Sequence, residues 1–137
     1  MAKVLALDIG TKRTGVAETD PLQIIASGLP TVATNELIEY LTHYVTAERP
    51  ELLVVGEPKR MHGAHSDVEV FIQSLLKRVS TKFPELKIER IDERFTSKMA
   101  SAAIAQSGLP KKKRQDKGLV DEVSAVLILQ SWLAKKK

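Results

Sequence analysis

The chain has 137 residues, 43% of them hydrophobic, which is enough for one folded domain with a real core and argues against disorder. It has no cysteine, so disulfide frameworks and thiolate metal sites are excluded, and no apolar run approaches the ~20 residues of a membrane span. The formal net charge of +4 permits nucleic-acid binding, whereas the 4% aromatic content argues against a stacking platform for single strands. No secretory signal is visible, so we expect a cytoplasmic protein.

The first part of the chain predicts three short strands joined by short connections. They cover about Lys3–Asp8, Gly15–Thr19 and Ile25–Val32. Gly28 and Pro30 weaken the third of them. Short connections favour antiparallel neighbours, so the three strands predict a meander.

The rest of the chain alternates helices with strands. A helix is predicted within residues 34–50, with Thr34 or Asn35 as its N-cap, and a second helix opens with the capping-box pair Ser66 and Glu69. Their apolar stripes consist of Leu37, Ile38, Leu41 and Val45 in the first and Val70, Phe71, Leu75, Leu76 and Val79 in the second. The remaining elements are strands at about Glu51–Gly56 and Leu86–Ile91 and helices at about Thr96–Gln106 and Leu119–Ala134.

This order of elements predicts an α/β fold. Three antiparallel strands followed by helical crossovers give a mixed five-stranded sheet with helices on its faces. No repeat or linker interrupts the pattern, so residues 1–137 are expected to form a single domain.

Acidic residues stand where two of the predicted strands end. Asp8 closes the first strand, Asp92 and Glu93 follow the fifth, and Asp121 and Glu122 fall in the first turn of the last helix. If the first and fifth strands are neighbours, their acids share one edge of the sheet. The start of the last helix, packed across that edge, would add a third acid.

Carboxylates gathered in this way need a cation to neutralise them. Mg²⁺ or Mn²⁺ suits such oxygen ligands, and one or two ions could clamp the attacking water and the leaving oxygen of a phosphodiester. Lys12 and Arg13, in the turn after Asp8, could hold the flanking phosphates. The alternatives are a plain turn at Asp8, a helix-dipole role for Asp121 and solvated turn charges.

A second group of cations precedes Asp121. Lys111, Lys112, Lys113 and Arg114 are followed by Lys117, and together they predict either a phosphate-binding loop or a solubilising one. Arg94 is a further candidate for substrate binding. The terminal run of residues 135–137, three lysines, is typical of a solvated tail.

Four blocks frame nearly the whole chain in this order: ALDIGTKRTGVA, LLVVGEPKRMHG, IDERFTS and DEVSAVLIL. They resemble the blocks of the YqgF/RuvX family, which has an RNase H-like fold and is described both as a Holliday-junction resolvase and as a nuclease trimming precursor 16S ribosomal RNA. The resemblance implies a metal-dependent endonuclease, with Asp8, the acid of the DER block and Asp121 as catalytic metal ligands. Neighbours on a strand point to opposite faces, and the resemblance favours Glu93 over Asp92.

Several alternatives stay open. The substrate could be the 5′ end of precursor 16S ribosomal RNA or a branched DNA, and symmetric cleavage of a junction would suit a homodimer. The chain could also be a non-catalytic nucleic-acid-binding factor of ribosome assembly. The first block also resembles a phosphate loop of actin-like ATPases, but 137 residues hold only one such core. Glu57, His62 and His65 are expected to be solvated loop residues.

Overall fold

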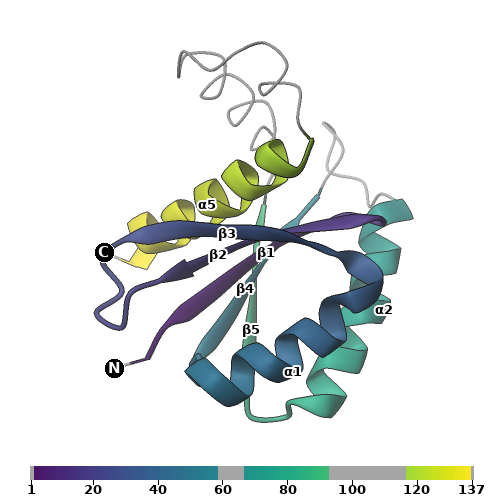
Figure 1. Cartoon of the computed structure of the whole chain (residues 1–137), viewed down its shortest axis with the longest axis horizontal. Helices are drawn as coiled ribbons and strands as arrows, with labels where there is room; N and C mark the ends of the chain where they lie inside the picture. Colours follow the sequence, from purple (N-terminus) through teal and green to yellow (C-terminus); the bar gives the residue numbers. More distant parts are fainter. Residues whose placement is uncertain (1, 59–66, 93–116, 137) are drawn as a thin grey trace.

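The computed structural model describes residues 2–58, 67–92 and 117–136, with only the backbone described at residues 117–120 and 136. Five strands form one sheet in the order β3-β2-β1-β4-β5 (Figure 1). Their bounds are Val4–Ile9 for β1, Arg13–Thr19 for β2, Ala26–Ala33 for β3, Leu52–Glu57 for β4 and Lys87–Asp92 for β5. The first three strands are antiparallel, and β4 and β5 continue the sheet parallel to β1. The predicted mixed five-stranded sheet is confirmed.

The order of the strands answers a question that the sequence left open. The first and fifth strands are not neighbours, because β4 lies between them and pairs with both. All three strands run in the same direction, so their carboxyl ends still meet at one edge of the sheet. Asp8 in β1 and Asp92 in β5 therefore lie at the same edge without sharing a ladder.

Helices cover both faces of this sheet (Figure 1). A 3₁₀ turn η1 (Thr34–Glu36), α1 (Leu37–Glu48) and α2 (Asp67–Lys82) pack on one face, and α5 (Lys117–Lys136) packs on the other. The predicted helix at Thr96–Gln106 lies outside the described residues. Within the described ranges, no helix is both long and apolar enough to cross a membrane.

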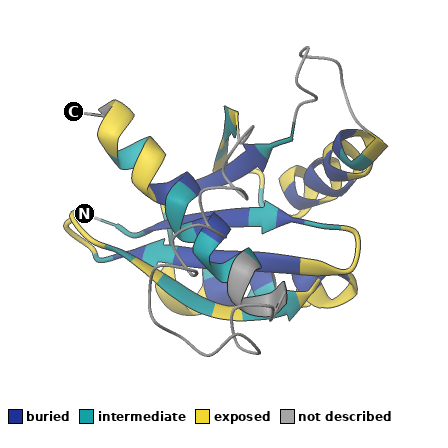
Figure 2. Cartoon of the chain, turned by 90° about the horizontal axis from the view of Figure 1, so that it is seen from above, coloured by how far each residue is buried: buried dark blue, intermediate teal, exposed yellow. Residues whose placement is uncertain are grey.

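The alternation of β1 defines the two faces. Leu5, Leu7 and Ile9 belong to the apolar cluster beneath α1 and α2, whereas Val4 and Ala6 belong to the cluster beneath α5. Figure 2 shows these buried strands between helices whose outer sides are exposed. Successive side chains of a strand point to opposite faces, so the position of any strand residue on one face or the other follows from this pattern.

The predicted N-cap of the first helix is wrong. Neither η1 nor α1 begins with a side-chain capping bond. Thr34 is buried, its hydroxyl donates to the Gly10 carbonyl oxygen at 2.7 Å, and it lies 2.9 Å from the Thr14 hydroxyl. Thr34 thus ties the start of α1 to the turn between β1 and β2 instead of capping a helix.

The apolar stripe of α2 differs from the prediction in its first turn, whereas Leu75, Leu76 and Val79 are buried as expected. Val70 and Phe71 were expected in the core, but their exposed fractions are 64% and 38%. The buried side chains are Glu69, Ile72, Leu75, Leu76 and Val79, spaced as one helical face. The reason is Glu69, whose carboxylate turns inward to meet Arg90. Its expected capping partner, Ser66, lies outside the described residues.

Candidate active site

Asp8 lies near the end of β1 on the face covered by α5. It is half-buried and follows Val4 and Ala6 at intervals of two residues, so its side chain leaves the sheet on the same side. In the antiparallel ladder it is paired with Gly15 of β2. The structure therefore places this predicted acid beside the helix that carries another.

That second acid is Asp121, which α5 brings directly over Gly15. A Cβ atom added at Gly15 would lie 2.0 Å from the backbone oxygen of Asp121, so only a glycine permits this approach. Residues opposite each other in an antiparallel ladder have Cα atoms ~4.5–5.5 Å apart. Asp8 and Asp121 are thus brought together through Gly15.

Asp121 lies two residues further into its helix than the sequence predicted. The helix α5 begins at Lys117, two residues before its expected start, and no acid stands in its first turn. Because the helix-dipole effect falls off within that turn, it gives no reason for an acid at position 121. The notable property of Asp121 is its place over Gly15, the ladder partner of Asp8.

Arg13 forms an ion pair with this carboxylate. Its Nε donates to Asp121 Oδ2 at 3.0 Å, and the exposed fractions of the two side chains are 42% and 25%. A pair so open to solvent stabilises the fold by only ~1 kcal/mol or less. Arg13 therefore orients Asp121 through a weak contact that other ligands can replace. The neighbouring residue Lys12 is exposed.

Asp92 does not join this pair of acids. In β5, Ile91 packs in the cluster beneath α5 and the Glu89 carboxylate accepts a hydrogen bond from Trp132 of that helix. Arg90 points the other way, toward Glu69 of α2. Asp92 follows Arg90 by two residues, so it faces away from Asp8.

Glu57 lies on that same far side of the sheet. It closes β4, is half-buried and pairs in register with Asp92. It is therefore a strand residue, and the expectation of a solvated loop acid at this position is wrong. The remaining candidates lie outside the described residues: Glu93, Arg94, Lys111, Lys112, Lys113, Arg114, His62 and His65.

The acids among the described residues can be compared with the ligands that a metal ion takes. No group of three or more His, Cys, Asp or Glu side chains that could hold a metal occurs among them. Asp8 and Asp121 nevertheless share one face and one edge, and both offer the hard oxygen ligands that Mg²⁺ and Mn²⁺ take. Mg²⁺ is commonly bound by one or two carboxylates together with substrate phosphate and water. The donor set fits such an ion.

Two features of the site were missed by the sequence reasoning. One is Gly15, whose signal was available, because a glycine inside a strand often marks a close backbone approach. The other is Arg90, which donates to both Glu69 carboxylate oxygens at 2.9 and 2.7 Å and to the carbonyl oxygens of Val55 and Gly56. Arg90 thereby fixes the end of β4 from the face opposite Asp8, and no local pattern indicated this.

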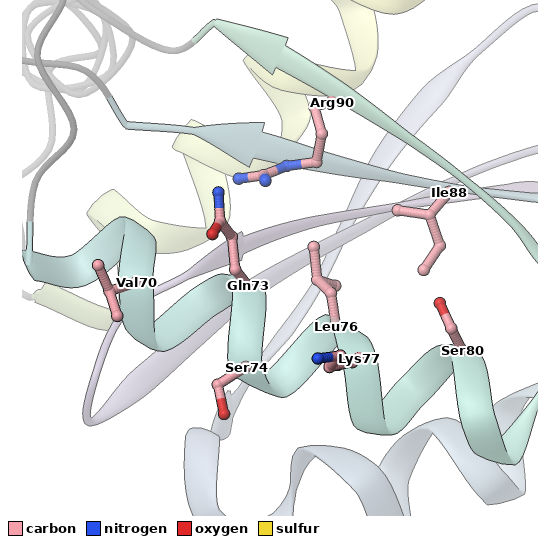
Figure 3. A pocket seen from close by; sticks show the side chains of 8 residues that line it. All are labelled: Val70, Gln73, Ser74, Leu76, Lys77, Ser80, Ile88 and Arg90. Carbon is pink, nitrogen blue, oxygen red and sulfur yellow. The ribbon is translucent and has the colours of Figure 1, made fainter.

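One large cavity lies away from these acids. It has a volume of about 650 Å³ and lies between α2 and β5, on the face opposite Asp8 (Figure 3). In Figure 3, Gln73 extends toward Arg90 and Ser74 points away from it. Because the Arg90 guanidinium is already bound to Glu69, this cavity offers no free cation from that residue.

Comparison with known proteins identifies the group to which this arrangement belongs. The model of the RuvX family, described as Holliday junction resolvase, matches residues 2–135. The chain belongs to the RuvX family. It therefore belongs to a family of nucleases, and the resemblance stated from its four blocks is confirmed.

Relatives of this RuvX chain match it along nearly their full length. A protein of Christiangramia forsetii named "Putative pre-16S rRNA nuclease" is 60% identical over 133 residues, which cover 97% of this chain and 98% of that protein. One of Flavobacterium johnsoniae with the same name is 48% identical over 137 residues, covering 100% and 99%. The Thermus thermophilus RuvC structure solved with a Holliday junction substrate has a TM-score of 0.56 at 12% identity, covering 98% of this chain and 96% of its own. That likeness confirms the RNase H-like fold.

Proposed function

We propose that this RuvX protein is a divalent-metal-dependent endonuclease that processes the 5′ end of precursor 16S ribosomal RNA in the cytoplasm. The observation that carries the proposal is the placement of Asp8 and Asp121 on one face at one edge of the sheet, in contact through Gly15. The names of the full-length relatives support the RNA substrate.

The metal ligands that we propose are Asp8, Asp121 and Glu93. Asp92 faces the other side of the sheet, which leaves Glu93 as the acid of the DER block available for this role. Bound Mg²⁺ or Mn²⁺ would supply the positive charge that activates water and stabilises the leaving oxygen. The carboxylates of the protein hold that charge at the phosphodiester.

The cations of the protein bind and orient the substrate. The Arg13 guanidinium is bound to Asp121, and if that carboxylate held a metal ion instead, the guanidinium would be available for a phosphate oxygen. Lys12 is exposed in the same turn and adds a second positive charge. In hydrolysis, a water oxygen forms a bond to phosphorus, the bond to the leaving oxygen breaks, and that oxygen gains a proton.

A second function is favoured by the description of the family model. Cleavage of branched DNA would use the same acids, but it would need two copies of the chain to cut two strands symmetrically. The two substrates are distinguished by offering a precursor 16S RNA 5′ segment and a four-way DNA junction side by side, with Mg²⁺ or Mn²⁺.

A set of four variants tests the proposed ligands in that assay. Asp8→Asn, Asp121→Asn and Glu93→Gln should each lower the cleavage rate by at least ~100-fold, because each removes a charge from the metal site at nearly constant shape. Asp92→Asn is the matched control, since it makes the same change one residue from Glu93, and it should retain most of the activity.

Other results would contradict the proposal. Wild-type rates in Asp8→Asn would exclude Asp8 as a metal ligand. If the wild type cuts neither substrate with Mg²⁺ or Mn²⁺, a non-catalytic binding factor is the remaining alternative. If Asp92→Asn loses activity and Glu93→Gln keeps it, the assignment within the DER block is wrong. Unchanged melting temperatures in the four variants would show that the fold is intact.

A further inference from the structure

A second cavity lies close to the turn between β1 and β2 that carries Lys12. It lies between that turn and the helices α1 and α2, which cover the face of the sheet opposite α5. Its volume is about 350 Å³, within the ~300–1,000 Å³ range of ligand pockets. The lining side chains that matter here are Thr11, Asn35, Ile38, Phe71, Ser74 and Arg78. They come from the turn after β1, from η1 and α1, and from α2.

Phe71 is the unusual residue of this cavity. The helical phase that buries Glu69 and Ile72 leaves the Phe71 ring 38% exposed to solvent. An aromatic ring that is partly open to solvent offers a face against which an unstacked nucleic-acid base can pack. The low aromatic content of the chain excludes a row of such rings, but one ring suffices for one base.

The other lining groups complement a nucleotide. Thr11, Asn35 and Ser74 carry hydroxyl or amide groups that can donate to and accept from the edge of a base. Arg78 is exposed and makes no ion pair with any residue that the structure describes, so its guanidinium is available for a phosphate. An aromatic ring, several hydrogen-bonding side chains and an exposed guanidinium are together the groups that suit a nucleotide.

The position of the cavity links it to the candidate active site. The Gly10 amide donates to the Arg13 carbonyl oxygen at 2.8 Å, and the Thr34 amide donates to the Lys12 carbonyl oxygen at 3.0 Å. These bonds fix one short turn in which Thr11 lines the cavity while Arg13 reaches Asp121. The turn that carries Arg13 to Asp121 therefore also borders the cavity.

We infer that this cavity binds one unpaired base of the RNA strand near the cleavage site, with the base stacked on Phe71 and an adjacent phosphate held by Arg78. The inference rests on the proposed function for the identity of the strand. The binding itself is independent of cleavage, so it can be measured where the enzyme cannot cut.

The test is a binding experiment with wild-type protein and a short single-stranded RNA in EDTA. Single abasic sites are introduced at each position of the RNA in turn. We expect one position at which loss of the base weakens binding to the wild type. Phe71→Ala should weaken binding of the intact RNA by roughly 5- to 150-fold, the range for a lost base–aromatic stack, and should be insensitive to that abasic site.

Three further variants separate stacking from other causes. Phe71→Tyr keeps the ring and should keep the abasic sensitivity, whereas Phe71→Leu keeps an apolar side chain without a ring and should lose it. Val70→Ala removes exposed apolar surface from the same helix, outside this cavity, and should leave affinity unchanged. Arg78→Gln should lower the salt slope of log affinity by ~0.7, the value for one single-strand phosphate.

The inference is overturned if no abasic position distinguishes the wild type from Phe71→Ala, or if Val70→Ala weakens binding as much. Either result would be clear even if the protein cuts RNA as proposed. Conversely, suppose that one abasic site weakens binding to the wild type but not to Phe71→Ala, and that no metal-dependent cleavage is seen. The base-binding inference would then be supported, and the nuclease proposal would be wrong.

Discussion

The contact between Arg13 and Asp121 places opposite charges where a metal ion is proposed to bind. A guanidinium and a divalent cation cannot occupy the same carboxylate oxygen, so they compete for Asp121. The ion pair is half-exposed and correspondingly weak, which makes it easy to exchange. In the proposed site, Arg13 would therefore balance the charge of Asp121 until metal and phosphate bind.

This competition gives a prediction for metal affinity. Arg13→Gln should raise the affinity for Mn²⁺, measured by calorimetry without nucleic acid, by roughly 1.5- to 5-fold, the worth of an exposed ion pair. Lys12→Gln is the matched control, because it removes the same charge from the same turn without breaking the pair, and it should have a smaller effect. A lower Mn²⁺ affinity in Arg13→Gln than in Lys12→Gln would mean that Arg13 organises Asp121 for the metal.

Individual residues differ in how far the sequence predicted them. Asp8 could be singled out because an acid at the end of an apolar strand is unusual, and the structure places it beside Asp121. The role of Thr34 could not, because its partners Gly10 and Thr14 lie at least 20 residues away in the chain. From the local sequence alone, a threonine at this position is equally consistent with a helix cap and with a long-range contact.

At the scale of elements, the site depends on how closely α5 can approach the sheet. Two glycines lie beneath this helix, Gly15 in β2 and Gly28 in β3. A Cβ atom at Gly15 would meet the backbone of Asp121 at 2.0 Å, whereas one at Gly28 would meet the side chain of Glu122 at 2.5 Å. A backbone cannot move aside locally, but a glutamate side chain can.

The two glycines therefore make a matched pair of variants. Gly15→Ala should lower the free energy of unfolding by about 1–3 kcal/mol or more, the cost of overpacking, and should lower cleavage further because Asp121 moves with its helix. Gly28→Ala should be neutral or slightly stabilising, since alanine restricts the unfolded chain. Urea denaturation and the cleavage assay measure both, and equal destabilisation of the two variants would contradict the backbone argument.

The elements themselves were largely predictable, and so was most of the buried face of α2. Strand ends fell within two residues of the structure because apolar runs and turn residues mark them locally. The first turn of α2 was missed because Glu69 matched a capping box, whereas its carboxylate binds Arg90, 21 residues away. A buried ion pair of this kind is decided by tertiary packing, which a periodicity argument does not contain.

At the scale of the whole molecule, the sheet separates two functions onto two faces. The acids meet α5 on one face, and the Phe71 cavity lies on the other, with the turn after β1 reaching both. Connection lengths predicted which strands are parallel and which are antiparallel. They could not predict that β4 lies between β1 and β5, because that order depends on how the crossovers pack.

The distribution of positive charge along the chain gives the last prediction. Lysines occur in two runs of three, at residues 111–113 and at residues 135–137. The first run comes shortly before α5 begins, and the second is at its other end. With a rise of ~1.5 Å per residue, Lys135 is about 20 Å from Asp121 along the helix, which is too far to contact a phosphate at the acids.

The two runs can be compared at equal charge. Replacing Lys111, Lys112 and Lys113 with Ala should lower the salt slope of log affinity for single-stranded RNA by up to ~2, because each lost phosphate contact contributes ~0.7. Replacing Lys135, Lys136 and Lys137 with Ala removes the same net charge and should leave the slope nearly unchanged. If both triple variants behave alike, the 111–113 run is ordinary solvated surface, and Lys12, Arg13 and Arg94 carry the phosphate contacts.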